Sequence, residues 1–214
     1  INGDAMKHTT ILSLLTLTAA SAMAQAAAPA SGPAVSGNLG FTSDYVFRGL
    51  SQTEGKLAVQ GGFDADFKNG LTAGVWASNV STTLGNLEVD LYANYAFKVG
   101  QVDLSVGYIN YTYSTAANGG EANVSATFSG VTLKVSKGVN GTLSDYYYEA
   151  AYSYDIAAVK GLNLGLHYGS DAASSKYDYS IALTYPVLGF AGTLSYSDHE
   201  VGKSITAVTL KKTF

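Results

Sequence analysis

The sequence predicts an all-β fold: an antiparallel, up-and-down transmembrane β-barrel, with twelve strands as the first expectation and ten as the alternative. Three observations support this prediction. A strand pattern of nearly constant length recurs to the last residue, the connections alternate between long and short, and aromatic residues gather at the strand ends. Together these features are typical of barrels that cross an outer membrane.

The clearest strand is predicted at residues 87–97, LEVDLYANYAF. Its odd-numbered residues are all apolar or aromatic, and its even-numbered residues are mostly polar. Successive side chains of a strand point to opposite sides, so this strand has one apolar and one polar face. At about 3.4 Å per residue, it is long enough to cross a bilayer when tilted.

The first three strands show the same alternation. Residues 35–48 place Leu39, Phe41, Tyr45 and Phe47 on one face, and residues 57–67 follow the same pattern. Residues 68–70, Lys-Asn-Gly, predict a tight hairpin turn, because Asn-Gly tolerates positive φ angles. Residues 71–80 form the third strand, whose polar face carries one large exception, Trp76.

The remaining strands complete the barrel in chain order. Short turn signals separate several of them, such as Ser129-Gly130, and residues 145–154 are rich in tyrosine. The predicted strands that follow residues 87–97 lie at residues 101–113, 122–128, 131–137, 145–154, 162–168, 177–185, 190–197 and 203–214.

The connections predict how the barrel sits in the membrane. Those after odd-numbered strands are longer and polar, including residues 49–56 and 114–121, whereas most others are short, with residues 155–161 as the exception. Long extracellular loops and short periplasmic turns distinguish the two ends of outer-membrane barrels. Both chain termini are therefore expected on the periplasmic side.

Aromatic side chains on the outward face are expected to form two girdles, where membrane meets water. Strand centres carry Leu, Val, Ala and Ile instead. The upper girdle is predicted to contain Tyr45, Phe47, Tyr108, Tyr146, Tyr148, Tyr168, Tyr177, Tyr179 and Tyr196, and the lower girdle Phe67, Tyr95, Phe97, Tyr154, Tyr185, Phe190 and Phe214.

The amino terminus predicts export. Residues 6–24 have a short basic start, an apolar stretch and a small-x-small site before Gln25, which is the pattern of a cleaved signal peptide. Residues 1–5 are interpreted as an over-extended translation start, residues 25–34 as a flexible lead-in and residues 35–214 as the barrel. The expected location is the bacterial outer membrane, with lipid and lipopolysaccharide around the barrel.

Composition excludes several classes of protein. The chain of 214 residues has no cysteine, which excludes disulfides and thiolate metal sites. Its net charge of −4 argues against a nucleic-acid binder, which normally carries a basic stripe. No cofactor and no metal site is predicted, because the carboxylates follow strand spacing rather than the loop spacing of a calcium site.

Four segments carry a family resemblance. Residues 43–53, SDYVFRGLSQT, resemble the opening signature of the TorF-type porins, a Gram-negative outer-membrane family of unknown function. Residues 60–64, 74–80 and 88–92 match further motifs in the same order. The terminal Phe214, with Leu210 and Val208 on its face, resembles the signal that outer-membrane assembly machinery recognises. The resemblance implies a transport barrel and does not supply its solute.

The inward face is the predicted functional surface. Many of its residues are small, which favours a narrow water-filled bore in a barrel of this size. Inward acids (Asp44, Asp64, Asp66, Glu88, Asp90, Asp103, Glu149 and Asp178) outnumber inward bases (Arg48, Lys134, Lys203 and Lys211). The predicted pore-lining residues are Asp44, Arg48, Gln60, Asp64, Asp66, Trp76, Glu88, Asp90, Lys134, Glu149, His167 and Asp178.

The sequence thus predicts a non-enzymatic channel for passive diffusion of small hydrophilic solutes, with a weak preference for cations. The alternative is a closed barrel that binds a partner through loops 49–56 and 114–121. Arg48 is interpreted either as a constriction residue or as half of an ion pair in the bore. An esterase built on His167 is the third hypothesis, and no serine carries a motif for it.

Overall fold

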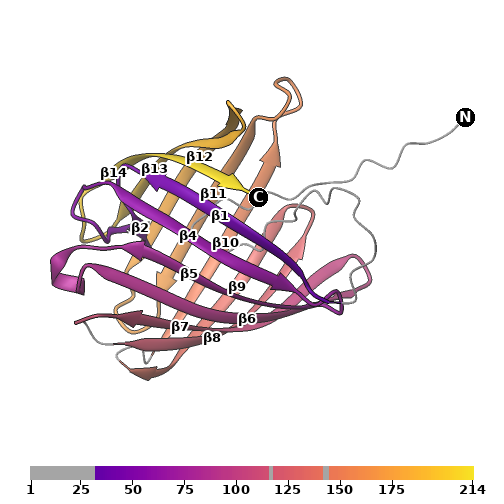
Figure 1. The fold of residues 1–214 in the computed structure, drawn as a ribbon, viewed down its shortest axis with the longest axis horizontal. Helices are drawn as coiled ribbons and strands as arrows, with labels where there is room; N and C mark the ends of the chain where they lie inside the picture. Colours follow the sequence, from indigo (N-terminus) through magenta and orange to yellow (C-terminus); the bar gives the residue numbers. More distant parts are fainter. Residues whose placement is uncertain (1–31, 116–117, 142–144) are drawn as a thin grey trace, which may run out of the picture.

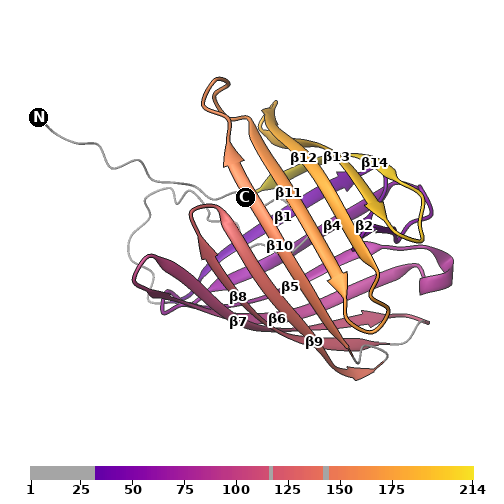
Figure 2. The same cartoon turned by 180° about the vertical axis from the view of Figure 1, so that it is seen from behind.

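The computed structural model describes residues 32–115, 118–141 and 145–214, and these form a closed β-barrel (Figures 1 and 2). The predicted signal peptide and most of the lead-in lie outside the described residues. The barrel strands are β1 (Ala34–Thr42), β4 (Ala58–Asp66), β5 (Leu71–Asn79), β6 (Leu87–Val99), β7 (Val102–Tyr113), β8 (Gly119–Phe128), β9 (Val131–Gly141), β10 (Tyr146–Asp155), β11 (Asn163–Asp171), β12 (Tyr177–Val187), β13 (Phe190–His199) and β14 (Ile205–Thr213).

Each barrel strand pairs with its neighbour in the chain in antiparallel register, and β1 closes the barrel by pairing with both β4 and β14. Backbone hydrogen bonds between Gly37 and Phe214 extend this closing seam to the last residue. Closure leaves no strand edge unpaired. The expectation of twelve strands is confirmed, and the alternative of ten is wrong.

Side chains alternate between a buried inner face and an exposed outer face. On β6, Glu88 and Asp90 are each 1% exposed, whereas Leu91 between Asp90 and Tyr92 is 58% exposed. Apolar side chains such as Leu133, Ile181 and Val208 are exposed around the whole circumference. A continuous apolar exterior of this kind is suited to lipid rather than to water. No helix among the described residues is long and apolar enough to cross a membrane.

The outward aromatic side chains form pairs at both ends of the barrel. We call the end where β1 leads to β4 the loop end, and the opposite end the turn end. Lys137 lies over the ring of Tyr146, and Lys212 over that of Phe190, as expected of side chains that reach toward an interface. Stacked pairs are Tyr146–Tyr148 and Tyr168–Tyr177 at the loop end, and Tyr95–Phe97 and Tyr152–Tyr154 at the turn end.

The first predicted strand, residues 35–48, is wrong beyond Thr42. There β1 ends, and residues 43–57 turn into the barrel as a loop that contains the short strands β2 (Val46–Phe47) and β3 (Leu50–Ser51). Tyr45 is 4% exposed and packs inside, so it does not belong to the outer girdle, and neither does Phe47. The chain turns because Asp44 bonds hydroxyl groups further along the loop instead of continuing the ladder.

Two further expectations need correction. The loop predicted at residues 114–121 is shorter, because β8 begins at Gly119 and includes Glu121. The loop predicted at residues 49–56 belongs to the segment that folds into the barrel. A 3-10 helix, η1 (Thr82–Leu84), lies in the connection between β5 and β6, where none was predicted.

Candidate functional site: the bore and its inner loop

Residues 43–57, which we call the inner loop, cross the bore at the loop end. The ring of Tyr45 lies 5.5 Å from that of Trp76 on β5. Phe47 lies 6.0 Å from Tyr111 on β7. Arg48, at the tip, reaches Glu121 on β8. The inner loop therefore spans the bore and contacts β5, β7 and β8 from the inside.

Hydrogen bonds within the inner loop hold it as a hairpin. Asp44 Oδ1 accepts from Ser51 Oγ at 2.6 Å and from Thr53 Oγ1 at 2.8 Å. Thr53 Oγ1 in turn accepts from the backbone N–H of Tyr45 at 3.0 Å. Because a carboxylate makes strong hydrogen bonds with hydroxyl donors, Asp44 fixes the angle at which the chain leaves β1.

The hairpin tip is formed by Arg48 and Gly49, whose φ angles are +48° and +73°. Two consecutive positive φ angles are typical of a tight hairpin turn. A Cβ at Gly49 would lie within 3 Å of the Asp198 carbonyl oxygen and of the side chains of Asp178 and His199. The tip therefore packs directly against β12 and β13, and only glycine fits there.

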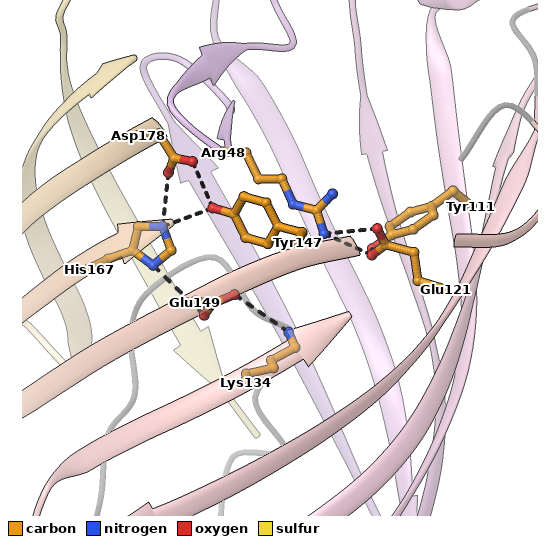
Figure 3. A network of polar contacts seen from close by, with 8 residues as sticks. All are labelled: Arg48, Tyr111, Glu121, Lys134, Tyr147, Glu149, His167 and Asp178. Carbon is orange, nitrogen blue, oxygen red and sulfur yellow. Dashed lines mark hydrogen bonds and ion pairs between the residues drawn. The ribbon is translucent and has the colours of Figure 1, made fainter. Parts of the chain in front are cut away.

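Arg48 is held on two sides (Figure 3). Its Nη2 lies 2.9 Å from each carboxylate oxygen of Glu121, and Tyr111 donates its hydroxyl to the same carboxylate at 3.1 Å. The guanidinium also lies 3.8 Å from the ring centroid of Tyr147 on β10. A cation over an aromatic ring is attracted to its π face. Arg48 thus joins the inner loop to the opposite wall.

Tyr147 connects Arg48 to a second polar group on β9 to β12 (Figure 3). Its hydroxyl donates to Asp178 at 2.7 Å, and Asp178 lies 2.9 Å from Nε2 of His167. Glu149 lies 3.8 Å from both His167 Nδ1 and Lys134 Nζ. The partners of His167 are acids and a phenol, rather than the serine hydroxyl that an esterase requires. This arrangement orders the wall and holds no activated nucleophile.

The wall formed by β4 to β7 is acidic and aromatic. Tyr92 donates its hydroxyl to Asp64, and Tyr113 donates to Glu88 at 2.7 Å. Gln60 donates to Ser78 at 3.4 Å across the β4–β5 pair. Glycines admit the larger rings: a Cβ at Gly74 would collide with Tyr92.

Toward the turn end the inward side chains become smaller and more exposed. Asp66 is exposed and accepts from the backbone N–H of Lys68 in the β4–β5 turn. Asp103 and Lys98 form an exposed ion pair of 3.1 Å at this end. The bore is thus crowded at the level of the inner loop, whereas the polar side chains nearer the turn end are exposed.

All twelve predicted pore-lining residues face the interior of the barrel, although Asp44 and Arg48 come from the inner loop instead of a strand. The structure brings Arg48, His167 and Asp178 into one network. Two residues of the bore, Glu121 and Tyr147, are not among the predicted pore-lining residues, and Glu121 falls in a segment predicted to be a loop. Each of the two lies an even number of positions along its strand from a polar residue that was predicted to face inward. Because such residues share a face, this spacing could have identified both.

In the described part of the chain, no group of three or more His, Asp or Glu side chains is placed to hold a metal ion. Several charged groups of the bore pair with one another, as Arg48 does with Glu121, whereas Glu88 and Asp90 are in no ion pair among the described residues.

Comparison with solved structures gives the same architecture. The chain matches a KdgM porin in complex with disordered oligogalacturonate, with a TM-score of 0.60 and 10% identity, over 84% of this chain and 97% of that one. A second KdgM porin structure matches with a TM-score of 0.59 and the same identity and coverage. Outer membrane phospholipase A from Escherichia coli matches with a TM-score of 0.47 and 9% identity, covering 85% of this chain and 96% of that one. At 10% identity, the likeness to the two KdgM structures establishes the porin-like barrel fold and nothing finer.

Comparison with curated protein sequences gives no match. The comparison with family models gives one over residues 26–213, described as a bacterial protein of unknown function, Gcw_chp. The TorF-type name suggested by the sequence motifs stays a prediction. Since the match spans nearly the whole barrel, the chain belongs to the Gcw_chp family of bacterial proteins.

Proposed function

We propose that this protein is an outer-membrane channel for passive diffusion of small hydrophilic solutes, with the inner loop as its constriction. The observation that carries the proposal is the contrast between the two faces of the wall. The outer face is apolar around the circumference, whereas the inner face carries charged and hydroxyl side chains. A polar inner face in a barrel of this width supports a hydrated path rather than a packed apolar core.

The charge of the bore supports a weak preference for cations. Glu88 and Asp90 lie on one wall, and no ion pair among the described residues involves either of them. A KdgM porin is known in complex with disordered oligogalacturonate, which is an anionic sugar. The acidic excess here favours cations and neutral solutes instead.

Single-channel recording in planar bilayers tests the proposal. We expect stepwise currents, and reversal potentials in a salt gradient that indicate modest cation selectivity, weakening as the salt concentration rises. Liposome swelling with sugars of increasing size would then give the size limit. Anion selectivity would contradict the proposed charge preference, while the absence of any current from correctly folded protein would contradict the channel.

The second candidate is a closed barrel that binds a partner through its loops. Tight packing at the loop end favours it, because Tyr45, Trp76 and Tyr92 are all buried in one cluster. The absence of any current in planar bilayers, together with no swelling of liposomes, would support this candidate. The same experiment therefore separates the two.

Export and assembly complete the proposal. The amino-terminal pattern at residues 6–24 supports secretion by a cleaved signal peptide, and the outward terminal Phe214 supports recognition by the assembly machinery. Lipid and lipopolysaccharide would then contact the apolar exterior. Replacing Phe214 with Ala should reduce the amount of folded protein in the outer membrane, measured by cell fractionation.

A further inference from the structure

Two carboxylates on β6 are buried inside the barrel and only partly bonded. Glu88 and Asp90 are each 1% exposed and lie on the same face of the strand, about 7 Å apart along it. Oε1 of Glu88 accepts a hydrogen bond from Tyr113. Oε2 of Glu88 and Oδ1 of Asp90 are buried without a hydrogen-bond partner among the described residues.

A buried carboxylate without a counter-charge is strongly destabilising, and a second carboxylate beside it increases the cost. The nearby bases are used elsewhere: Arg48 pairs with Glu121, and Lys134 lies beside Glu149. No described ion pair involves Glu88 or Asp90. The two free oxygens therefore mark a position at which a positive charge would be stabilised.

The surroundings limit what that charge can be. Trp76 and Tyr111 are the register partners of Asp90 on either side, so large aromatic residues flank it on both neighbouring strands. The available ligand atoms are carboxylate and hydroxyl oxygens, which prefer hard cations such as Ca²⁺ or Mg²⁺. Two negative charges match one divalent cation.

We propose that Glu88 and Asp90 form a binding site for a hard divalent cation in the bore. The inference rests on the proposed channel function for its role, as a stopping point for cations that cross the barrel. Two protein carboxylates, with water completing the coordination, give weak binding, with a dissociation constant on the order of 1 mM. Weak binding is what permeation requires, since the ion must also leave.

The test uses Tb³⁺, a luminescent substitute for Ca²⁺, bound to the refolded full-length protein. Trp76 is the single tryptophan of the chain and is paired in register with Asp90, so it is placed to sensitise bound Tb³⁺. We expect saturable sensitised emission that Ca²⁺ displaces. Glu88→Gln and Asp90→Asn should each weaken binding by about tenfold or more, and the double variant should abolish it.

Asp103→Asn is the matched control, because Asp103 also faces the bore but is exposed near the turn end. Emission that does not saturate, or that is unchanged in the double variant, would overturn the site. Should the double variant fail to refold, Glu88→Asp, which retains the charge but shortens its reach, must lower Tb³⁺ affinity for the proposal to stand. Tb³⁺ luminescence does not depend on conduction. A protein that binds Tb³⁺ but carries no current in bilayers would therefore contradict the proposed channel function and leave the cation site standing.

Discussion

Arg48 is the side chain that fastens the inner loop to the far wall of the barrel. Its guanidinium contacts the Glu121 carboxylate through two hydrogen bonds of 2.9 Å and lies over the Tyr147 ring. Lysine could supply the charge but not the planar group that contacts both at once. At the scale of single residues, this contact decides whether the loop stays across the bore.

We predict that Arg48→Ala destabilises the protein by roughly 1–3 kcal/mol, because Glu121 is left buried with fewer partners. Urea unfolding in lipid vesicles, followed by the fluorescence of Trp76, measures this. The double variant Arg48→Ala, Glu121→Gln is the control, and it should recover part of the loss since the unpaired charge is gone. A double variant as unstable as the sum of its single variants would show that the pair is not coupled.

The inner loop is the element that distinguishes this barrel from a simple tube. Its hydrogen bonds are mostly internal, through Asp44, Ser51 and Thr53, whereas the barrel is held by the continuous ladder from β1 to β14. The ladder does not depend on the loop. The barrel ladder can therefore form without the loop, while the loop narrows the bore and adds its own contacts, such as that of Arg48 with Glu121, to the stability of the protein.

Replacing residues 44–56 with a short Gly-Ser linker is expected to raise single-channel conductance several-fold, because it removes the inner loop from the bore. The barrel strands should still form, measured by β-sheet circular dichroism, although resistance to heat should fall as in Arg48→Ala, because Glu121 loses the same partner. Shortening the connection at residues 172–176 is the control, because that loop does not enter the network around Arg48. Equal conductance of the loop-replaced and original proteins would place the constriction elsewhere.

At the scale of the whole molecule, the apolar outer face of the barrel makes lipid, and not water, its favourable surroundings. Leu91 is 58% exposed near the middle of β6, with Val75 and Asn110 as its register partners. An arginine at mid-bilayer depth costs about 2–4 kcal/mol. We predict that Leu91→Arg lowers the free energy of folding into lipid vesicles by about this amount.

Ala96→Arg provides the control on the same strand, because Ala96 faces the bore near the turn end, opposite Ser105. There the guanidinium can remain hydrated, and we expect little loss of stability. Unfolding both variants with urea in the same vesicles compares the two faces directly. Equal stability of Leu91→Arg and the original protein would mean that lipid does not contact this face.

Periodicity was sufficient to predict most of the fold. The alternation at residues 87–97 predicted β6 and its two faces, and the same parity placed Glu149, His167 and Asp178 in the bore. The hairpin turn predicted at residues 68–70 is present, but its positive φ angles fall on Lys68 and Gly70 and not on Asn69, as the Asn-Gly pattern had suggested. These features are local, because they depend on the two-residue repeat of a strand and on the φ preference of a turn.

The inner loop could not be predicted in this way. Tyr45 and Phe47 continue the alternation of β1, so the pattern extends past the point where the strand ends at Thr42. Asp44 bonds the chain into a hairpin, but what holds that hairpin inside the barrel is a set of contacts with Trp76, Glu121 and the β12–β13 wall, all distant in sequence. The alternation of apolar and polar residues indicates the face of each side chain only as long as the strand remains hydrogen-bonded to its neighbours.

The sequence by itself determined that this chain forms a twelve-stranded barrel with an apolar outside and a polar inside, because both follow from side-chain parity along each strand. Only the tertiary structure decided what fills the bore. The position of the inner loop, the partner of Arg48 and the unbonded carboxylate oxygens of Glu88 and Asp90 depend on strands far apart in the chain that meet around the closed barrel. Closure brings those groups together, and no local repeat in the sequence encodes which of them will touch.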